Sequence, residues 1–237
     1  MKILITNDDG IDSDGLIRLS GVACKYGEVY VFAPNGQCSA MSHRITLREH
    51  IDVYEVKDFP VSGVKAYRVD GTPADCVRIG IMSFIKEIPD LVLSGINFGY
   101  NCGTDIQYSG TVAAALEGAS EGAHSIAFSE GANGVHEVTD LYLEEMLKTY
   151  MNKALERNQI WNINFPECKM QDFKGILTER KIADKAFYDD GYSIEELPDG
   201  GLRLRVCGEY KECAPEGTDV RACIDNYISI GTVKNVS

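Results

Sequence analysis

The 237-residue chain has little positive charge: 23 Lys and Arg stand against 36 Asp and Glu, which gives a net charge of −13, and no basic run occurs. This balance argues against binding a nucleic-acid polymer or an anionic membrane surface, because both require clustered cations. It allows a small anionic substrate, since one metal ion can invert the local field. No apolar stretch approaches the length of a membrane span. The first apolar run is also too short for a signal peptide, since it already contains Asn7, Asp8 and Asp9.

The eight cysteines are scattered and include no Cys-x-x-Cys pair. We therefore expect reduced thiols and a cytoplasmic protein. Cys207, Cys213 and Cys223 come nearest to a cluster. Plain packing of these three thiols is a better interpretation than a zinc site.

Several catalytic motifs are also missing. No G-x-S-x-G elbow occurs, and no G-x-G-x-x-G follows the first strand, so a dinucleotide cofactor is not expected. The lysine and the spacing of a P-loop are absent. The first strand does not end in the Asp-x-Asp of phosphatases that form an aspartyl-phosphate. A metal-activated water is the more natural nucleophile that remains.

The N-terminus is the most informative segment present. The apolar run Lys2–Thr6 predicts a buried parallel strand, and it stops at Asn7-Asp8-Asp9-Gly10. Ligands of open α/β sheets bind just beyond the carboxyl ends of strands, and two adjacent carboxylates there favour a hard divalent cation. The same residue types are also common in turns and at helix N-caps, so they could simply form a turn or cap the helix that follows. From this segment alone, the metal site and the turn are equally supported.

Strand-like and helix-like segments alternate through the first two-thirds of the chain. Thr72 and Pro73 mark one helix start clearly, as N-cap and first helical residue. The expected strands are Lys2–Thr6, Val29–Ala33, Leu91–Ser94, Ser125–Phe128 and Ile160–Phe165, and the expected helices are Asp12–Cys24, Ala74–Lys86, Thr111–Glu121 and Val138–Arg157. Ile45–Val56 and Val64–Val69 are expected to be strands or a hairpin excursion, with Ser62-Gly63 as the turn. Such alternation predicts an α/β fold: a Rossmann-like three-layer sandwich around a mostly parallel sheet.

After Pro166 the segments become short and β-like, separated by Gly- and Asp-rich turns. The segments Ile176–Thr178, Leu202–Val206 and Tyr227–Ile230 belong to this group. We interpret residues 1–166 as the catalytic core. Residues 167–237 are expected to form a β-rich appendage of hairpins and tail, used in oligomerisation.

Three loops are further candidates for function. Residues 95–110 form a long glycine-rich segment with Asn97 and Asn101, and a loop of this length is uncommon unless it is functional. Ser109 begins a helix whose free N–H groups could bind a phosphate, although, from this segment alone, helix capping is the safer interpretation. The segment Gln37–His43 offers hydroxyls, which in a loop are more often simply solvated. Its histidine is not predicted to be a general base.

Taken in order, these segments resemble the SurE family, survival proteins that are metal-dependent 5′-nucleotidases. The matching segments are Ile5-Thr6-Asn7-Asp8-Asp9-Gly10; Ala33-Pro34 with Ser39; Gly71-Thr72-Pro73-Ala74-Asp75-Cys76-Val77; Ser94-Gly95-Ile96-Asn97-Phe98-Gly99; Tyr108-Ser109-Gly110-Thr111-Val112-Ala113-Ala114-Ala115; and Thr218-Asp219. The resemblance covers most of residues 1–130 and resumes near 218–230.

The resemblance implies one divalent ion, Mg²⁺ or Mn²⁺, held by Asp8, Asp9, Ser39 and Asn97. It also implies that the phosphate is held by a second set: Asn101, Ser109, Gly110 and Thr111. The implied reaction is hydrolysis of nucleoside 5′-monophosphates, with hydrolysis of 3′-monophosphates left open, and with Asp8 and Asp9 as the catalytic residues. Asp8 is considered a metal ligand first and a general base or nucleophile second. The Gly71–Asp75 motif is interpreted as structural.

The chain departs from the family pattern at Asn35-Gly36, where Asp-Arg is usual, at Ala40, and in its short ending. We expect a homodimer or homotetramer, with substrate preference and oligomer size unspecified by the sequence. Two alternatives remain open: a hydrolase of short polyphosphate or another phosphomonoester, and a non-catalytic nucleotide-binding module on the same fold.

Overall fold

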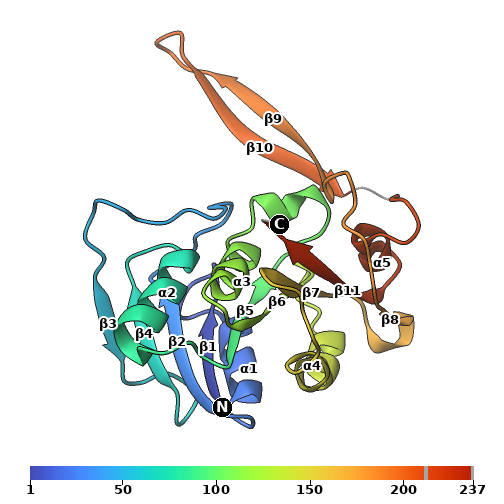
Figure 1. Cartoon of the computed structure of the whole chain (residues 1–237). Helices are drawn as coiled ribbons and strands as arrows, with labels where there is room; N and C mark the ends of the chain where they lie inside the picture. Colours follow the sequence, from blue (N-terminus) through green and yellow to red (C-terminus); the bar gives the residue numbers. More distant parts are fainter. Residues whose placement is uncertain (211–212, 236–237) are drawn as a thin grey trace.

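The computed structural model describes residues 1–210 and 213–235, and within them a nine-stranded sheet forms the centre of the molecule (Figure 1). Its strand order is β3-β4-β2-β1-β5-β6-β7-β11-β8. The strands are β1 (Lys2–Thr6), β2 (Glu28–Pro34), β3 (Val53–Val56), β4 (Lys65–Val69), β5 (Leu91–Phe98), β6 (His124–Glu130), β7 (Gln159–Phe165), β8 (Gly175–Leu177) and β11 (Tyr227–Lys234). The pairs from β4 through β7 are parallel, whereas β3 pairs antiparallel with β4, and β11 with β7.

Helices cover both faces of this sheet. They are α1 (Asp14–Ala23), α2 (Pro73–Ile79), α3 (Gly110–Ser120), α4 (Glu137–Tyr150) and the short α5 (Asp219–Ile224). Successive strand residues point to opposite faces. In β1, Ile3 and Ile5 share a buried cluster with residues of α1 and α4, whereas Leu4 shares one with residues of α2 and α3. The predicted three-layer, mostly parallel α/β fold is therefore confirmed.

Two helix starts follow the local chemistry that the sequence indicates. Thr72 accepts a hydrogen bond from the Asp75 N–H, and the Asp75 carboxylate accepts one from the Thr72 N–H, so the two residues form a capping box. Ser109 caps α3 by accepting a hydrogen bond from the Val112 N–H at 3.0 Å. The structural interpretation of the Gly71–Asp75 motif agrees with this geometry.

Four predicted elements need correction. Of the strand or hairpin expected over Ile45–Val56, only Val53–Val56 forms a strand, β3, which pairs antiparallel with β4, while Thr46 is bound to Asp75 at the start of α2. The helix expected over Ala74–Lys86 is α-helical only to Ile79 and continues as a π-helix over Gly80–Ile85. The other two differences are in β5 and α4. β5 runs on to Phe98, into the segment predicted as a loop, and α4 ends at Tyr150 rather than Arg157.

The last third divides into two parts. β9 (Tyr188–Glu196) and β10 (Leu202–Tyr210) form an antiparallel hairpin that projects away from the body of the molecule (Figure 1). β8 and β11 instead extend the central sheet beyond β7, so the sheet crosses the expected boundary at residue 166. The use of residues 167–237 in oligomerisation stays a prediction. In the described ranges, no helix combines the length and the apolar character needed to cross a membrane.

Candidate active site

Asp8 and Asp9 lie directly beyond the carboxyl end of β1, between its neighbours β2 and β5. Asp8 is 5% exposed, and its Oδ1 accepts a short hydrogen bond from the Thr111 hydroxyl. Asp9 is half-buried, and its Oδ2 accepts a hydrogen bond from the Phe98 N–H at 3.0 Å. The strand order thus brings one end of β5 and the start of α3 against the two carboxylates.

Burial makes both carboxylates hard to ionise. Burial, reinforced by the negative charge of Asp9, raises the pKa of Asp8 to about 6 even though the Thr111 hydroxyl lowers it. The pKa of Asp9 is raised by burial and by the charge of Glu130, against hydrogen bonds from the Phe98 N–H and the Gln37 side chain. Two adjacent, poorly solvated carboxylates are an electrostatic arrangement that a bound cation would relieve.

The other two predicted metal ligands flank this pair. Ser39 follows Cys38, whose N–H donates to the Asp8 carbonyl oxygen at 2.7 Å. Asn97 precedes Phe98, the residue that donates to Asp9, and its own side-chain amide donates to the Gly99 carbonyl oxygen at 2.7 Å. Each of them is therefore one residue away from a direct contact with the aspartates. Their coordination of a metal stays a prediction.

The N-terminus of α3 packs directly on Asp8. A Cβ added to Gly110 would lie 2.9 Å from the Asp8 Cβ and 3.1 Å from the Pro73 Cγ, which is closer than real Cβ contacts allow. Only glycine permits this approach of the helix backbone to the carboxylate. The first-turn N–H groups of α3, at the positive end of its dipole, therefore begin beside Asp8.

Asn101 lies deeper than the sequence suggests. Its side-chain amide donates to the Ser129 hydroxyl at 2.8 Å, and its backbone N–H donates to the Asn164 side chain at 2.9 Å. Asn162 donates to the Asn101 carbonyl oxygen at 2.8 Å. These bonds anchor the loop after β5 to β6 and β7, and contact between Asn101 and phosphate stays a prediction. The alternating Asn162 and Asn164 on an apolar strand are the signal that could have revealed this anchor.

Sequence reasoning missed a group of charged residues beside Asp9. Glu130 is 2% exposed, and Arg18 pairs with it, with Asp14 and with Asp140. His136 lies 3.1 Å from the Glu130 carboxylate. Arg18 thus neutralises Glu130, a carboxylate whose charge acts on Asp9, while its own charge is already shared among three acidic partners.

His43, which was not predicted to act as a base, holds its loop in place. Its Nε2 lies 2.7 Å from the Glu117 carboxylate on α3. The neighbouring Ser42 donates to the Gln107 carbonyl oxygen at 2.7 Å. These bonds fasten the loop that carries Ser39 across the start of α3.

The donor set fits a hard divalent cation. In the part of the chain that the structure describes, no three His, Cys, Asp or Glu side chains gather into a metal cluster, so the aspartate pair would need neutral oxygen ligands. A serine hydroxyl and an asparagine amide oxygen are such ligands, and Mg²⁺ and Mn²⁺ accept oxygen donors of this kind. The arrangement suits a site with few protein ligands, which leaves positions for a phosphate oxygen and for water.

Comparison with known proteins gives consistent matches. The family model described as "Survival protein SurE" matches residues 3–186. The 5′-nucleotidase SurE of Thermosipho melanesiensis is 40% identical over 238 residues, covering 97% of this chain and 90% of the relative. That of Clostridium botulinum is 38% identical over 234 residues, covering 97% and 91%. The crystal structure of the SurE protein from Aquifex aeolicus superposes with a TM-score of 0.84 at 33% identity, covering 100% of this chain and 95% of that one.

Proposed function

The chain belongs to the SurE family, and we propose that it is a metal-dependent 5′-nucleotidase that hydrolyses nucleoside 5′-monophosphates to nucleoside and phosphate. The observation that carries the proposal is the buried pair Asp8 and Asp9 packed against the first turn of α3. This proximity supports a site where carboxylates hold a cation and N–H groups bind an anion, as a phosphomonoesterase requires.

In this proposal Asp8, Asp9, Ser39 and Asn97 hold one Mg²⁺ or Mn²⁺ ion. When bound, the ion polarises a phosphoryl oxygen and makes water more acidic. Thr111 keeps Asp8 oriented through its hydroxyl bond. Asp8 is also considered as the group that accepts a proton from the attacking water, a role second to that of metal ligand.

The phosphate subsite is proposed at the start of α3. The Gly110 and Thr111 N–H groups would stabilise negative charge on the phosphoryl oxygens, with Ser109 capping the same turn. Asn101 is placed in this subsite as well, held by Ser129 and Asn164. Because these groups are fixed by packing before substrate arrives, little reorganisation is needed during the reaction.

The test is phosphate release from a panel of 5′- and 3′-nucleoside monophosphates with Mg²⁺, with Mn²⁺ and with EDTA. We expect release that depends on metal, favours the 5′-monophosphates and disappears with the chelator. Short polyphosphate and a sugar phosphate belong in the same panel, because preferential release from either would replace the nucleotide assignment. Nucleotide binding without any release would instead favour the non-catalytic module.

We also propose that the molecule is a homodimer or homotetramer assembled through the β9–β10 hairpin. One hairpin face carries five apolar side chains that are 52–64% exposed: Tyr192, Ile194, Leu202, Leu204 and Val206. A continuous apolar face of this kind is rarely left in water. Light scattering after gel filtration should give an oligomer that dissociates in the double variant Ile194→Asp/Leu204→Asp, whereas Arg205→Ser on the opposite hairpin face should have no effect. A monomeric native protein would refute this assembly.

A cytoplasmic location completes the proposal. All eight cysteines are free thiols, although Cys102 and Cys223 lie with their sulfur atoms 3.4 Å apart. Free thiols in such proximity are typical of a reducing compartment. Cell fractionation tests the location, and recovery of the protein outside the cytoplasm would contradict it.

A further inference from the structure

A cavity of about 320 Å³ is lined by Gln37 and Cys38, the loop residues that contact the aspartate pair, and has no role in the chemistry described above. It lies at the carboxyl ends of β2 and β4, the strands next to β1 on one side. Neighbouring strands are about 5 Å apart, so the cavity begins about 5 Å from the end of β1 and extends to about 10 Å. A ribose and base attached to a phosphate held beside Asp8 can reach this range of distance.

The cavity and the aspartates share one loop. Gln37 lines the cavity, and its side chain forms the hydrogen bond that lowers the pKa of Asp9. Cys38 also lines it, and its N–H donates to the Asp8 carbonyl oxygen. The same two loop residues therefore contact both the cavity and the aspartate pair.

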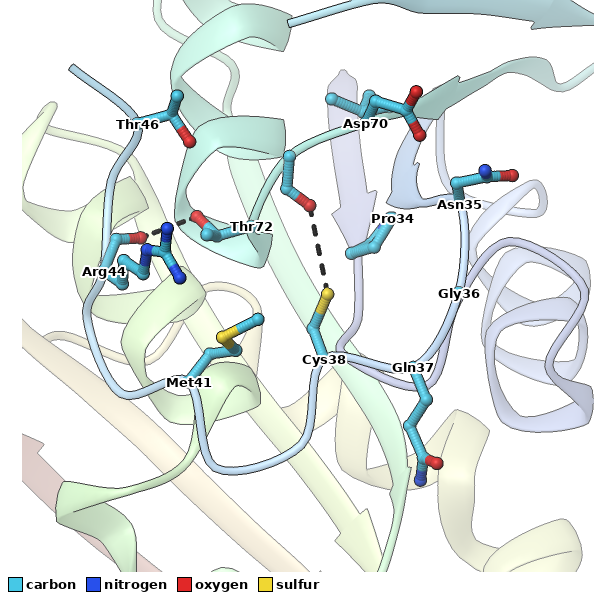
Figure 2. A pocket seen from close by; sticks show the side chains of 12 residues that line it. Pro34, Asn35, Gly36, Gln37, Cys38, Met41, Arg44, Thr46, Asp70 and Thr72 are labelled. Carbon is cyan, nitrogen blue, oxygen red and sulfur yellow. Dashed lines mark hydrogen bonds between the residues drawn. The ribbon is translucent and has the colours of Figure 1, made fainter. Parts of the chain in front are cut away.

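The cavity is lined by a hydrogen-bond donor, a hydrogen-bond acceptor and apolar surface. Figure 2 shows Met41 and Arg44 on one side of the cavity and Asn35, Gly36 and Asp70 on the other. In residues 1–210 and 213–235, the Arg44 guanidinium and the Asp70 carboxylate make no ion pair or hydrogen bond within the protein. Both side chains are therefore free to bind a ligand. Arg44 can donate hydrogen bonds to acceptor atoms of the ligand, and Asp70 can accept them from its hydroxyl or amino groups.

A second cavity, of about 290 Å³, is lined by Asp9 itself but is less suitable. Its charged groups are already satisfied by one another, since Glu130 is paired with both Arg18 and His136. A polar ligand would have to break these buried pairs, which costs free energy without a comparable gain. The cavity beyond β2 imposes no such cost.

We propose that the cavity lined by Asn35–Cys38, Met41, Arg44 and Asp70–Thr72 binds the nucleoside part of the substrate, with Arg44 donating to it and Asp70 accepting from it. This inference rests on the proposed function, because it deepens the substrate assignment of the same site. The volume is at the small end of ligand pockets and suits a single nucleoside rather than an oligonucleotide. Met41 supplies a flexible apolar surface for a base.

Gly36 offers a way to fill the cavity without straining the fold. A Cβ added there meets no atom within 4 Å, and Gly36 is not among the residues with positive φ. The substitution Gly36→Leu should therefore occupy ligand space only. Gly21→Leu is its control, because Gly21 on α1 likewise has nothing within 4 Å of an added Cβ and lies outside the cavity. Arg48→Gln is the control for Arg44→Gln, since Arg48 is exposed and does not line the cavity.

The experiment compares adenosine 5′-monophosphate with p-nitrophenyl phosphate, which has no nucleoside. For Gly36→Leu, Arg44→Gln and Asp70→Asn, we expect the ratio of kcat/KM for the nucleotide to that for p-nitrophenyl phosphate to fall at least about tenfold, as loss of a polar or steric contact does. The two controls should keep the native ratio within about twofold. A ratio that stays native in all three cavity variants would overturn the inference while leaving the proposed function intact.

A second measurement is independent of catalysis. Calorimetry with adenosine, guanosine, cytidine and uridine should detect binding of at least one nucleoside to the native protein, weakened at least about tenfold by Gly36→Leu and not by Gly21→Leu. Absence of nucleoside binding, or equal binding by both variants, would overturn the inference. If the native protein binds a nucleoside in this way but releases no phosphate from any substrate, then the proposed function fails and the assignment of the cavity stands.

Discussion

Replacing Asp8 with asparagine is expected to lower phosphate release by about 10³-fold or more at saturating Mg²⁺, and Asp9→Asn should have a similar effect. An amide keeps the shape of the side chain but supplies no negative charge to a cation, so the stabilisation that a metal ion gives to the transition state is lost. Steady-state kinetics with and without added Mn²⁺ would measure the effect. Near-native turnover of Asp8→Asn would refute the assignment of the metal site.

The same variant should be folded, and more stable than the native protein when both lack metal. The Oδ1 of asparagine still accepts from Thr111, and the variant removes a carboxylate whose pKa rises from 3.8 to about 6 on folding. The folded state binds more protons between these values, so native stability increases as pH falls through this window and the ionised Asp8 destabilises the fold above it. We expect Asp8→Asn to raise the free energy of unfolding by about 1 to 3 kcal/mol at pH 8, and by little at pH 4. Urea denaturation at both pH values measures this, and a loss of stability at pH 8 would contradict the assigned burial of Asp8.

The second large effect is expected from Gly110→Ala. The added methyl group would lie 2.9 Å from the Asp8 Cβ, so either Asp8 or the start of α3 has to move. A displacement of about 1 Å between catalytic groups costs on the order of 10²-fold in rate. We expect a loss of this size in kcat/KM, together with weaker metal binding in a Mn²⁺ titration.

Gly21→Ala is the matched control for this prediction. Both glycines are in α-helices, but an added Cβ at Gly21 meets no neighbouring atom. Alanine there should stabilise the protein by about 0.5 to 1 kcal/mol through its higher helix propensity and leave activity native. If Gly110→Ala behaved like Gly21→Ala, the packing of α3 on Asp8 would have no catalytic importance.

The electrostatics of the site explain why a metal ion is needed. The chain carries a net charge of −13, and the substrate phosphate is itself an anion. Near Asp9, Arg18 is already shared among Asp14, Glu130 and Asp140. Among the described residues around the aspartates, two further positive groups could attract an anion. They are the N-terminal end of α3 and the unpaired Arg44. The proposed divalent cation at Asp8 and Asp9 would reverse this local balance.

Local sequence chemistry predicted a large part of this protein. The buried run before Asp8, the capping residues Thr72 and Ser109, and the alternation of strands and helices all depend on neighbours within a few residues. These signals were sufficient for the fold class and for the position of the aspartates at the end of a strand. They were sufficient because strand burial, turn chemistry and helix capping are short-range effects.

Tertiary structure alone decided how distant segments meet. Strand order placed Thr111 and Gly110 against Asp8, about a hundred residues away in sequence, and buried Asn101 among side chains of β6 and β7. It also added β8 and β11 to the central sheet instead of to an appendage, and created the cavity beyond β2 and β4. These features depend on which strands pair and in which register, and that choice is made by packing of the whole core rather than by the residues of any one segment.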